Sequence, residues 1–221
     1  MHSQTLQMSH NLVSDTTVSN IPPWSQFEPQ ICLSLTKYFL KDITNPEAYK
    51  QAFLEITSRH RNYVQIFTDG SKVDEKVAAA AVSSVAPNSP FPCPLRDYCS
   101  IYTAELQAIL FALKQAYQSQ ERKFMIFSDS LSAFQALGKL KTDHPLLIQI
   151  QEEIVFIWVP GHVGIRENEA ADRAAKEAFD KKKPTADFMT FSDLKPFMAK
   201  HVYQIWQKEW DETGLVSNKF H

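Results

Sequence analysis

The sequence predicts an α/β fold in which helices flank one mixed, five-stranded sheet. Apolar runs of strand length alternate with amphipathic helical segments through residues 61–183. The first three expected strands follow one another directly and form a meander, whereas a helix precedes each later strand, and this order is typical of a mixed sheet. The chain has 221 residues, of which 44% are hydrophobic, enough for one domain with extensions.

The segments outside this domain have a different composition. Residues 1–30 are polar and rich in serine and threonine, and we expect a disordered arm there. Residues 31–60 are expected to form an extended and helical lead-in, in which Asn45 is a suitable N-cap and Pro46 a suitable first helical residue. Residues 184–221 are expected to form a helical C-terminal tail with an aromatic stripe.

The elements of the domain can be placed from periodicity and from turn residues. Strands are expected at residues 64–68, 77–84, within 87–100, at 123–128 and at 154–159. The third strand contains Pro92 and Pro94, which confine it to an edge of the sheet. Helices are expected at residues 103–118, 131–137, 145–153 and from Asn168 to about residue 183. The connection between the helix at 145–153 and the fifth strand is unusually short.

Bulk composition narrows the classes of function. The net charge of −2 offers no overall basic surface, which counts against a passive nucleic-acid coat. The three cysteines are odd in number and lack metal-ligand spacing, so we expect a reducing, intracellular compartment. The apolar runs are much shorter than a membrane span, so we expect no membrane association.

Four acids lie near the ends of the expected elements. Asp69 and Asp129 end the first and fourth strands, Glu105 is expected in the first turn of the long helix, and Asp172 lies in the last helix. If the first and fourth strands are parallel neighbours, their acids meet at the carboxyl edge of the sheet. Crowded carboxylates repel one another and are stable as anions mainly around a hard cation. We therefore expect a two-ion Mg²⁺ site, with Mn²⁺ as a second possible metal.

Each of these acids also has an ordinary structural interpretation. Asp69 precedes a glycine and could belong to a turn, and Asp129 could cap the short helix. Glu105 could complement the helix dipole. Two surface ion pairs at helical spacing are a further alternative, Asp172 with Lys176 and Glu169 with Arg173.

Four segments together resemble type 1 ribonuclease H: FTDGS (67–71), YTAELQAI (102–109), FSDS (127–130) and WVPGHVGIRENEAADRAAKEA (158–178). The resemblance covers about residues 62–180 and is strongest to the domain that follows reverse transcriptase in jockey-like non-LTR retrotransposons of arthropods, and it extends more loosely into the lead-in and the tail. The resemblance implies a sheet with strand order 3-2-1-4-5. It also implies an enzyme, a metal-dependent endonuclease that hydrolyses the RNA strand of RNA–DNA hybrids and leaves a 5′-phosphate and a 3′-hydroxyl.

The resemblance also implies roles for individual residues. Asp69, Glu105, Asp129 and Asp172 match the metal-binding catalytic acids of the family. His162 matches a histidine on a mobile loop that assists proton transfer or product release. The implied partner is an RNA–DNA hybrid, and we expect a monomer.

Three polar residues are further candidates for contacts with the hybrid, where they could read the 2′-hydroxyl group: Ser71, Ser130 and Asn168. A capping or turn role is an equal alternative for each of them. Glu167 stands where the family has glycine, so we expect strain in the loop that carries His162. Together with the shortened helix and connection before the fifth strand, Glu167 leaves a second interpretation open, a nucleic-acid-binding remnant without catalysis. The aromatic tail leaves a third one open, a protein-interaction module.

Overall fold

The computed structural model describes residues 29–38, 44–86, 90–139 and 153–181, together with residues 193, 199, 202–208, 210 and 211. The chain divides into two compact units, Thr16–Ala186 and a second unit formed by Met1–Asp15 and Asp187–His221. The described residues of the second unit are helical, and the rings of Trp206 and Trp210 lie 5.7 Å apart. Residues 1–28 of the expected disordered arm, residues 145–152 of the expected helix and much of the tail lie outside the described residues. At the ends of the arm and of that helix the prediction is wrong, because Gln30 and Glu153 begin strands.

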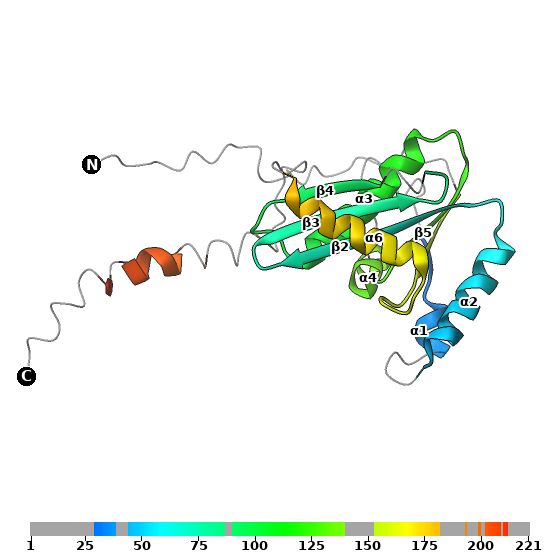
Figure 1. The fold of residues 1–221 in the computed structure, drawn as a ribbon, viewed down its shortest axis with the longest axis horizontal. Helices are drawn as coiled ribbons and strands as arrows, with labels where there is room; N and C mark the ends of the chain where they lie inside the picture. Colours follow the sequence, from blue (N-terminus) through cyan, green and yellow to red (C-terminus); the bar gives the residue numbers. More distant parts are fainter. Residues whose placement is uncertain are drawn as a thin grey trace, which may run out of the picture. The chain divides into compact units, whose positions relative to one another are not determined.

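The larger unit is built on one mixed sheet of six strands, in the order β1-β6-β5-β2-β3-β4 (Figure 1). Its strands are β1 Gln30–Cys32, β2 Val64–Val73, β3 Lys76–Ser83, β4 Phe91–Leu95, β5 Lys123–Ser128 and β6 Glu153–Trp158. β1, β6, β5 and β2 are parallel, and β3 and β4 continue the sheet in antiparallel pairing. The prediction of an α/β fold with a mixed sheet is confirmed, and the proline-containing strand lies at an edge as expected.

The predicted number of five strands is wrong because the sequence analysis did not predict β1. The three residues of β1 pair with Val155, Phe156 and Ile157 of β6. A strand of this length has too few side chains to produce an alternating pattern, so its sequence, QIC, carries no signal. β1 covers the backbone edge that β6 would otherwise expose, and the lead-in is thereby part of the sheet.

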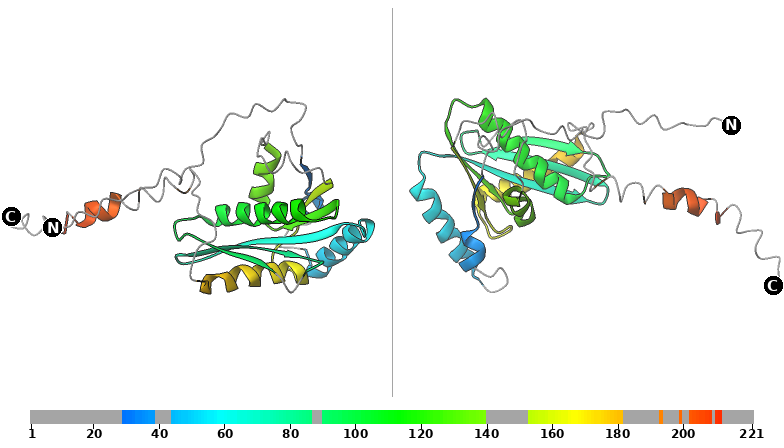
Figure 2. Two further views of the ribbon diagram at one scale, coloured as in Figure 1. Left: turned by 90° about the horizontal axis from the view of Figure 1, so that it is seen from above. Right: turned by 180° about the vertical axis from the view of Figure 1, so that it is seen from behind.

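Helices cover both faces of the sheet (Figure 2, left). α3 (Ile101–Gln118) and α4 (Leu131–Lys139) lie on one face, and α6 (Arg166–Glu177) and α2 (Pro46–Arg59) lie on the other. A short helix, α1 (Ser34–Tyr38), follows β1, and a 3-10 turn, η2 (Ala178–Asp180), follows α6. The four alanines 78–81 of β3 are fully buried, and their small side chains allow helices on both faces to lie close to the strand.

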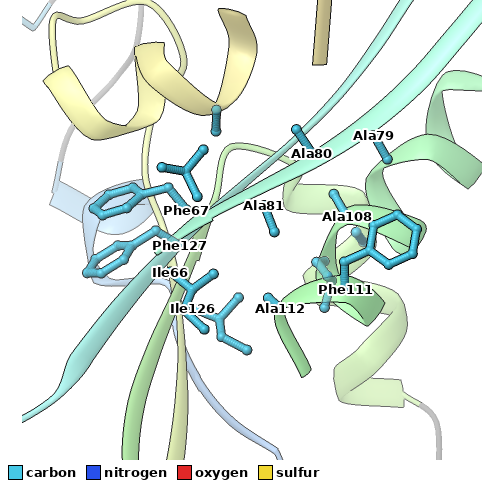
Figure 3. Close-up of a cluster of buried hydrophobic side chains, with 14 of the residues drawn as sticks. Ile66, Phe67, Ala79, Ala80, Ala81, Ala108, Phe111, Ala112, Ile126 and Phe127 are labelled. Carbon is cyan, nitrogen blue, oxygen red and sulfur yellow. The ribbon is translucent and has the colours of Figure 1, made fainter. Parts of the chain in front are cut away.

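Alternation along the central strands gives the sheet two apolar faces (Figure 3). Phe67 of β2 and Phe127 of β5 are stacked, with ring centroids 4.6 Å apart. Phe53 of α2 packs against Phe127 at a centroid distance of 5.4 Å. Ile66 and Ile126, one position earlier in each strand, lie on the opposite side near α3. Helix α2 therefore packs on the strand segments that lead into Asp69 and Asp129.

β2 is longer than predicted. Asp69 does not end the strand in an Asp-Gly turn, because β2 continues to Val73 and the hairpin turn lies at Asp74, which has a φ of 54°. The strand register explains the difference. Pairing with β5 stops at Thr68, opposite Ser128, whereas pairing with β3 continues to Val73. Asp69 marks the end of the parallel pairing and not the end of the strand.

The start of α6 also differs from the prediction. Asn168 is not the N-cap, because the helix already begins after Ile165, which makes no side-chain cap hydrogen bond. Glu167 lies within this helix and has no positive φ, so the expected strain at Glu167 is wrong. The left-handed residues of the preceding loop are His162 and Gly164, with φ values of 60° and 80°.

Candidate metal centre

Asp69, Glu105 and Asp129 come together at the carboxyl edge of β2 and β5. One carboxylate oxygen from each residue lies within 4.8 Å of the others. Asp69 and Asp129 directly follow Thr68 and Ser128, the last paired residues of these parallel strands. We call Asp69, Glu105 and Asp129 the acid cluster. The fold thus brings together three of the four acids singled out from the sequence.

Gly70 allows α3 to bring Glu105 to this edge of the sheet. A Cβ atom at position 70 would lie 2.7 Å from the backbone nitrogen of Glu105 and 2.9 Å from the carbonyl carbon of Ala104. The glycine therefore permits close packing of helix on strand, and it does not form the turn that Asp-Gly suggests. Because α3 begins at Ile101, Glu105 lies in the second turn of the helix and not in the first. Its position no longer favours a role in complementing the helix dipole.

Two residues near β6 pack against Asp129. The indole Nε1–H of Trp158 donates a hydrogen bond to the carbonyl oxygen of Asp129, at 3.0 Å. Gly161 lies directly against the carboxylate, since a Cβ atom there would come within 2.2 Å of Asp129 Oδ2. Any side chain at position 161 would have to displace this carboxylate. The sequence analysis noted the PGH segment but could not foresee this contact, which joins residues far apart in the chain.

Burial makes two members of the acid cluster, Asp69 and Glu105, costly to ionise. Asp69 is 6% exposed and Glu105 is 8% exposed. Burial, followed by the charges of Asp129 and Asp172, raises the pKa of Asp69 from 3.8 to about 8. Burial, followed by the charges of Asp69 and Asp129, raises the pKa of Glu105 from 4.5 to about 9, although a hydrogen bond from the backbone of Gly70 opposes this rise. At neutral pH these two carboxyl groups retain protons unless a cation replaces them.

Two buried oxygens of the acid cluster lack, within the described part of the chain, the hydrogen-bond partners that buried carboxylates usually have, and a bound cation would supply the missing partner. Asp69 Oδ2 and Glu105 Oε2 are buried and have no hydrogen-bond partner among the described residues. Buried carboxylate oxygens are almost always paired, because an unpaired one loses its hydration without compensation. Three carboxylates that supply only oxygen ligands match the preference of Mg²⁺ and Mn²⁺. The residues present therefore fit a divalent cation.

The fourth acid, Asp172, belongs to a neighbouring group on α6. Ligand atoms of His162, Glu169 and Asp172 lie within 4.8 Å of one another. Glu169 Oε2 lies 3.8 Å from His162 Nδ1, and its Oε1 accepts a hydrogen bond from the Gly164 backbone at 3.4 Å. Glu169 thus lies beside the loop that carries His162, and the sequence analysis did not predict this position. Its spacing of three residues from Asp172 could have indicated it, because residues three apart lie on the same face of a helix.

Asp172 forms the ion pair with Lys176 that was one of the alternatives, with Nζ and Oδ2 2.8 Å apart. The charges of α6 nevertheless reach the acid cluster. Asp172 and Glu169 raise the pKa of Asp69, and Lys176 lowers it. Asp172 therefore combines an ordinary helix pair with a position close enough to influence the cluster.

The three polar candidates for hybrid contacts are buried. Ser71 is 7% exposed and lies opposite Ala78 in the β2–β3 pairing. Ser130 is 9% exposed, and its carbonyl oxygen accepts a hydrogen bond from the Phe134 N–H at 3.3 Å at the start of α4. Asn168 is 3% exposed, and its Oδ1 has no hydrogen-bond partner among the described residues. Ser130 therefore has the helix-start role that was its structural alternative.

No family model matches the chain, and no curated protein matches it either. Among the described residues, no helix has both the length and the apolar character needed to cross a membrane. The interpretation of this centre therefore depends on its own geometry and on the sequence segments that form it.

Proposed function

We propose that this chain binds divalent cations at the acid cluster and hydrolyses the RNA strand of RNA–DNA hybrids. The observation that carries the proposal is the convergence of Asp69, Glu105 and Asp129 within 4.8 Å, with two buried oxygens that lack partners among the described residues. A protein that only needed a turn, a helix cap and a favourable helix charge at these positions would have no reason to bring the three carboxylates together.

The strand order supports the proposal at the level of the fold. Written in the present labels, the expected order 3-2-1-4-5 is β4-β3-β2-β5-β6, and these five strands follow one another in this order within the sheet. Open α/β sheets bind ligands at the carboxyl ends of their parallel strands, which is where the acid cluster lies. We therefore propose a ribonuclease H-like fold to which β1 has been added at one edge.

The proposed reaction is attack of water on a phosphodiester, with departure of the 3′-oxygen. Bound Mg²⁺ or Mn²⁺ would supply an activated water and stabilise charge on the leaving oxygen. Asp69, Glu105 and Asp129 would hold the cations. Asp69 lies within β2, Asp129 directly follows β5, and Glu105 belongs to α3. Carboxylates on such packed elements keep fixed positions, which favours repeated binding of a phosphodiester in one geometry.

His162 would exchange a proton with solvent during this reaction. Its side chain is 71% exposed, and its Nδ1 lies 3.8 Å from Glu169 Oε2. Such an exposed position suits a group that assists proton transfer or release of product at the rim of a site. Asp172, on the adjacent α6, would complete the acids around the cations.

The central test is cleavage of the labelled RNA strand in an RNA–DNA hybrid, with and without Mg²⁺ or Mn²⁺. We expect metal-dependent cleavage by the wild type and none by Asp129→Asn. Asp97→Asn is the matched control, because Asp97 is an exposed acid of the same domain, and it should cleave normally. An intact hybrid with folded wild-type protein in both metals would exclude the proposed activity.

The alternative of a nucleic-acid-binding remnant without catalysis has one less argument in its favour. Glu167 lies in a regular helix, so strain at that residue no longer supports loss of activity. The short connection that was the other argument falls mostly in residues 140–152, outside the described part of the chain. Salt-sensitive hybrid binding without metal-dependent cleavage would favour this alternative in the same assay.

A further inference from the structure

Asp172 forms an ion pair with a lysine of the same helix. Among the described residues, the acid cluster contains Asp69, Glu105 and Asp129, and Asp172 does not join them within the same distance. Instead its Oδ2 lies 2.8 Å from Lys176 Nζ, one turn later on α6. The Asp172 side chain is only 17% exposed, so this pair is partly shielded from solvent.

Lys176 also acts beyond its direct partner. Its positive charge opposes the rise in the pKa of Asp69 that burial causes. The hydrogen bond to Asp172, together with the charges of Asp172, Asp69 and Glu169, raises the pKa of Lys176 itself. The ammonium group therefore lies in the field of several acidic side chains, and its direct partner among them is Asp172.

We propose that Lys176 is a built-in counter-cation of the metal centre, which restrains Asp172 and competes with the divalent cation for it. This inference rests on the proposed metal centre and adds a regulatory contact to it. In the metal-free protein Lys176 stabilises the carboxylates. The same positive charge would oppose a bound divalent cation, and Asp172 would have to leave Lys176 to reach that cation.

If Lys176 competes with the cation in this way, removing its charge should have two opposite effects: a lower melting temperature without metal and tighter binding of the metal. Without metal, loss of the ammonium leaves the carboxylates with less compensation, so the protein should melt at a lower temperature. With metal, the divalent cation no longer competes with Lys176, so it should bind more tightly. A residue with only a structural role would weaken both states, and an ordinary surface lysine would change neither.

The test compares the full chain with three variants by calorimetric titration of Mg²⁺ and by melting curves with and without the cation. Lys176→Gln removes the charge, and Lys176→Arg retains it. Arg173→Gln is the charge-matched control, because Arg173 is an exposed cation of the same helix. We expect Lys176→Gln to bind Mg²⁺ about three- to tenfold more tightly than the wild type and to melt about 2 °C lower without it. Lys176→Arg and Arg173→Gln should stay within about twofold of wild-type affinity.

Equal or weaker Mg²⁺ binding by Lys176→Gln, or the same gain in Arg173→Gln, would overturn this inference and leave the metal centre intact. If Lys176→Gln does not fold, Lys176→Met, which keeps the aliphatic stem, replaces it in the same comparison. A wild-type chain that binds no divalent cation would refute the metal centre and this inference together. If Lys176→Gln melts at a lower temperature without Mg²⁺ and binds Mg²⁺ more tightly, but the wild type leaves the hybrid uncut, only the catalytic proposal is refuted.

Discussion

Asp69 and Glu105 carry carboxyl groups at positions where proteins usually place apolar side chains. Each is less than a tenth exposed, and each has an oxygen without a hydrogen-bond partner among the described residues. Such groups reduce the stability of the metal-free fold, because ionising them in a buried site is unfavourable. A divalent cation at the proposed site would reverse this effect, since it would bind the ionised form. The same two residues therefore connect folding, pH and cation binding.

The first prediction concerns pH. The pKa values of Asp69 and Glu105 are raised from 3.8 and 4.5 to about 8 and about 9 in the folded state, so between these values the folded protein binds more protons than the unfolded chain. The stability that these groups contribute is complete below their unfolded pKa values and is lost as pH rises towards the folded ones. We expect the melting temperature in a metal chelator to fall from about pH 5 to about pH 8.

The variant Asp69→Asn separates this effect from other titrations, because its side chain cannot ionise. Its melting temperature should fall less steeply over the same range, and added Mg²⁺ should reduce the slope in the wild type. Equal slopes in Asp69→Asn and the wild type would contradict the assignment of this titration to Asp69.

The second prediction concerns Gly161. In Gly161→Ala the new Cβ atom would lie 2.2 Å from Asp129 Oδ2, so the carboxylate must move. We expect Mg²⁺ affinity to fall about 10- to 100-fold, as when the supporting residues of a metal site are changed, with little loss of folding stability. Calorimetric titration measures the affinity. Gly138→Ala is the control, because its Cβ meets only the flexible end of Ile31 at 3.3 Å. Wild-type affinity in Gly161→Ala would show that the contact has no role in positioning Asp129.

At the scale of elements, the distance between α3 and β2 determines whether Glu105 reaches the acid cluster. The contact involves backbone on both sides, since a Cβ at position 70 would lie 2.7 Å from the Glu105 nitrogen. We expect Gly70→Ala to push the helix outwards, to lower the free energy of unfolding by about 1–3 kcal/mol and to weaken Mg²⁺ binding. Urea denaturation and calorimetry measure the two effects. A stable Gly70→Ala variant with unchanged Mg²⁺ binding would mean that α3 need not lie this close.

The added edge strand gives a further prediction at this scale. Removing residues 1–32 deletes β1 and exposes the backbone edge of β6, whereas removing residues 1–28 leaves β1 intact. We expect only the longer deletion to speed amide hydrogen exchange in β6 and to lower the free energy of unfolding by about 1–2 kcal/mol. Identical exchange in the two deletions would show that β1 does not protect this edge.

For the whole molecule, the sequence predicted those features that depend on local pattern. The strand at 123–128, the N-cap at Asn45 and the edge position of the proline-containing strand all follow from neighbouring residues. The convergence of Asp69 and Asp129 followed from parallel pairing of their strands, which long apolar runs indicate well. The features that sequence analysis missed depend on tertiary contacts.

These missed features share a physical cause. β1 is stabilised by its pairing with β6 and not by its own three residues, and Gly70 is required by the approach of α3. α6 begins before Asn168 although Ile165 is a poor N-cap, because burial of one helix face outweighs the weak start signal. Three of the four acids form the acid cluster, whereas Asp172 pairs with Lys176. This difference depends on side-chain positions, which spacing along the chain does not reveal.

The most direct measurement is the location of Mn²⁺ by anomalous diffraction from crystals of the full chain. The account predicts a peak at about 2.0–2.2 Å from carboxylate oxygens of Asp69, Glu105 and Asp129, lost in Asp129→Asn crystals treated in the same way. Bound Mn²⁺ elsewhere with none at these three carboxylates, or no peak beside them at high Mn²⁺ concentration, would contradict it.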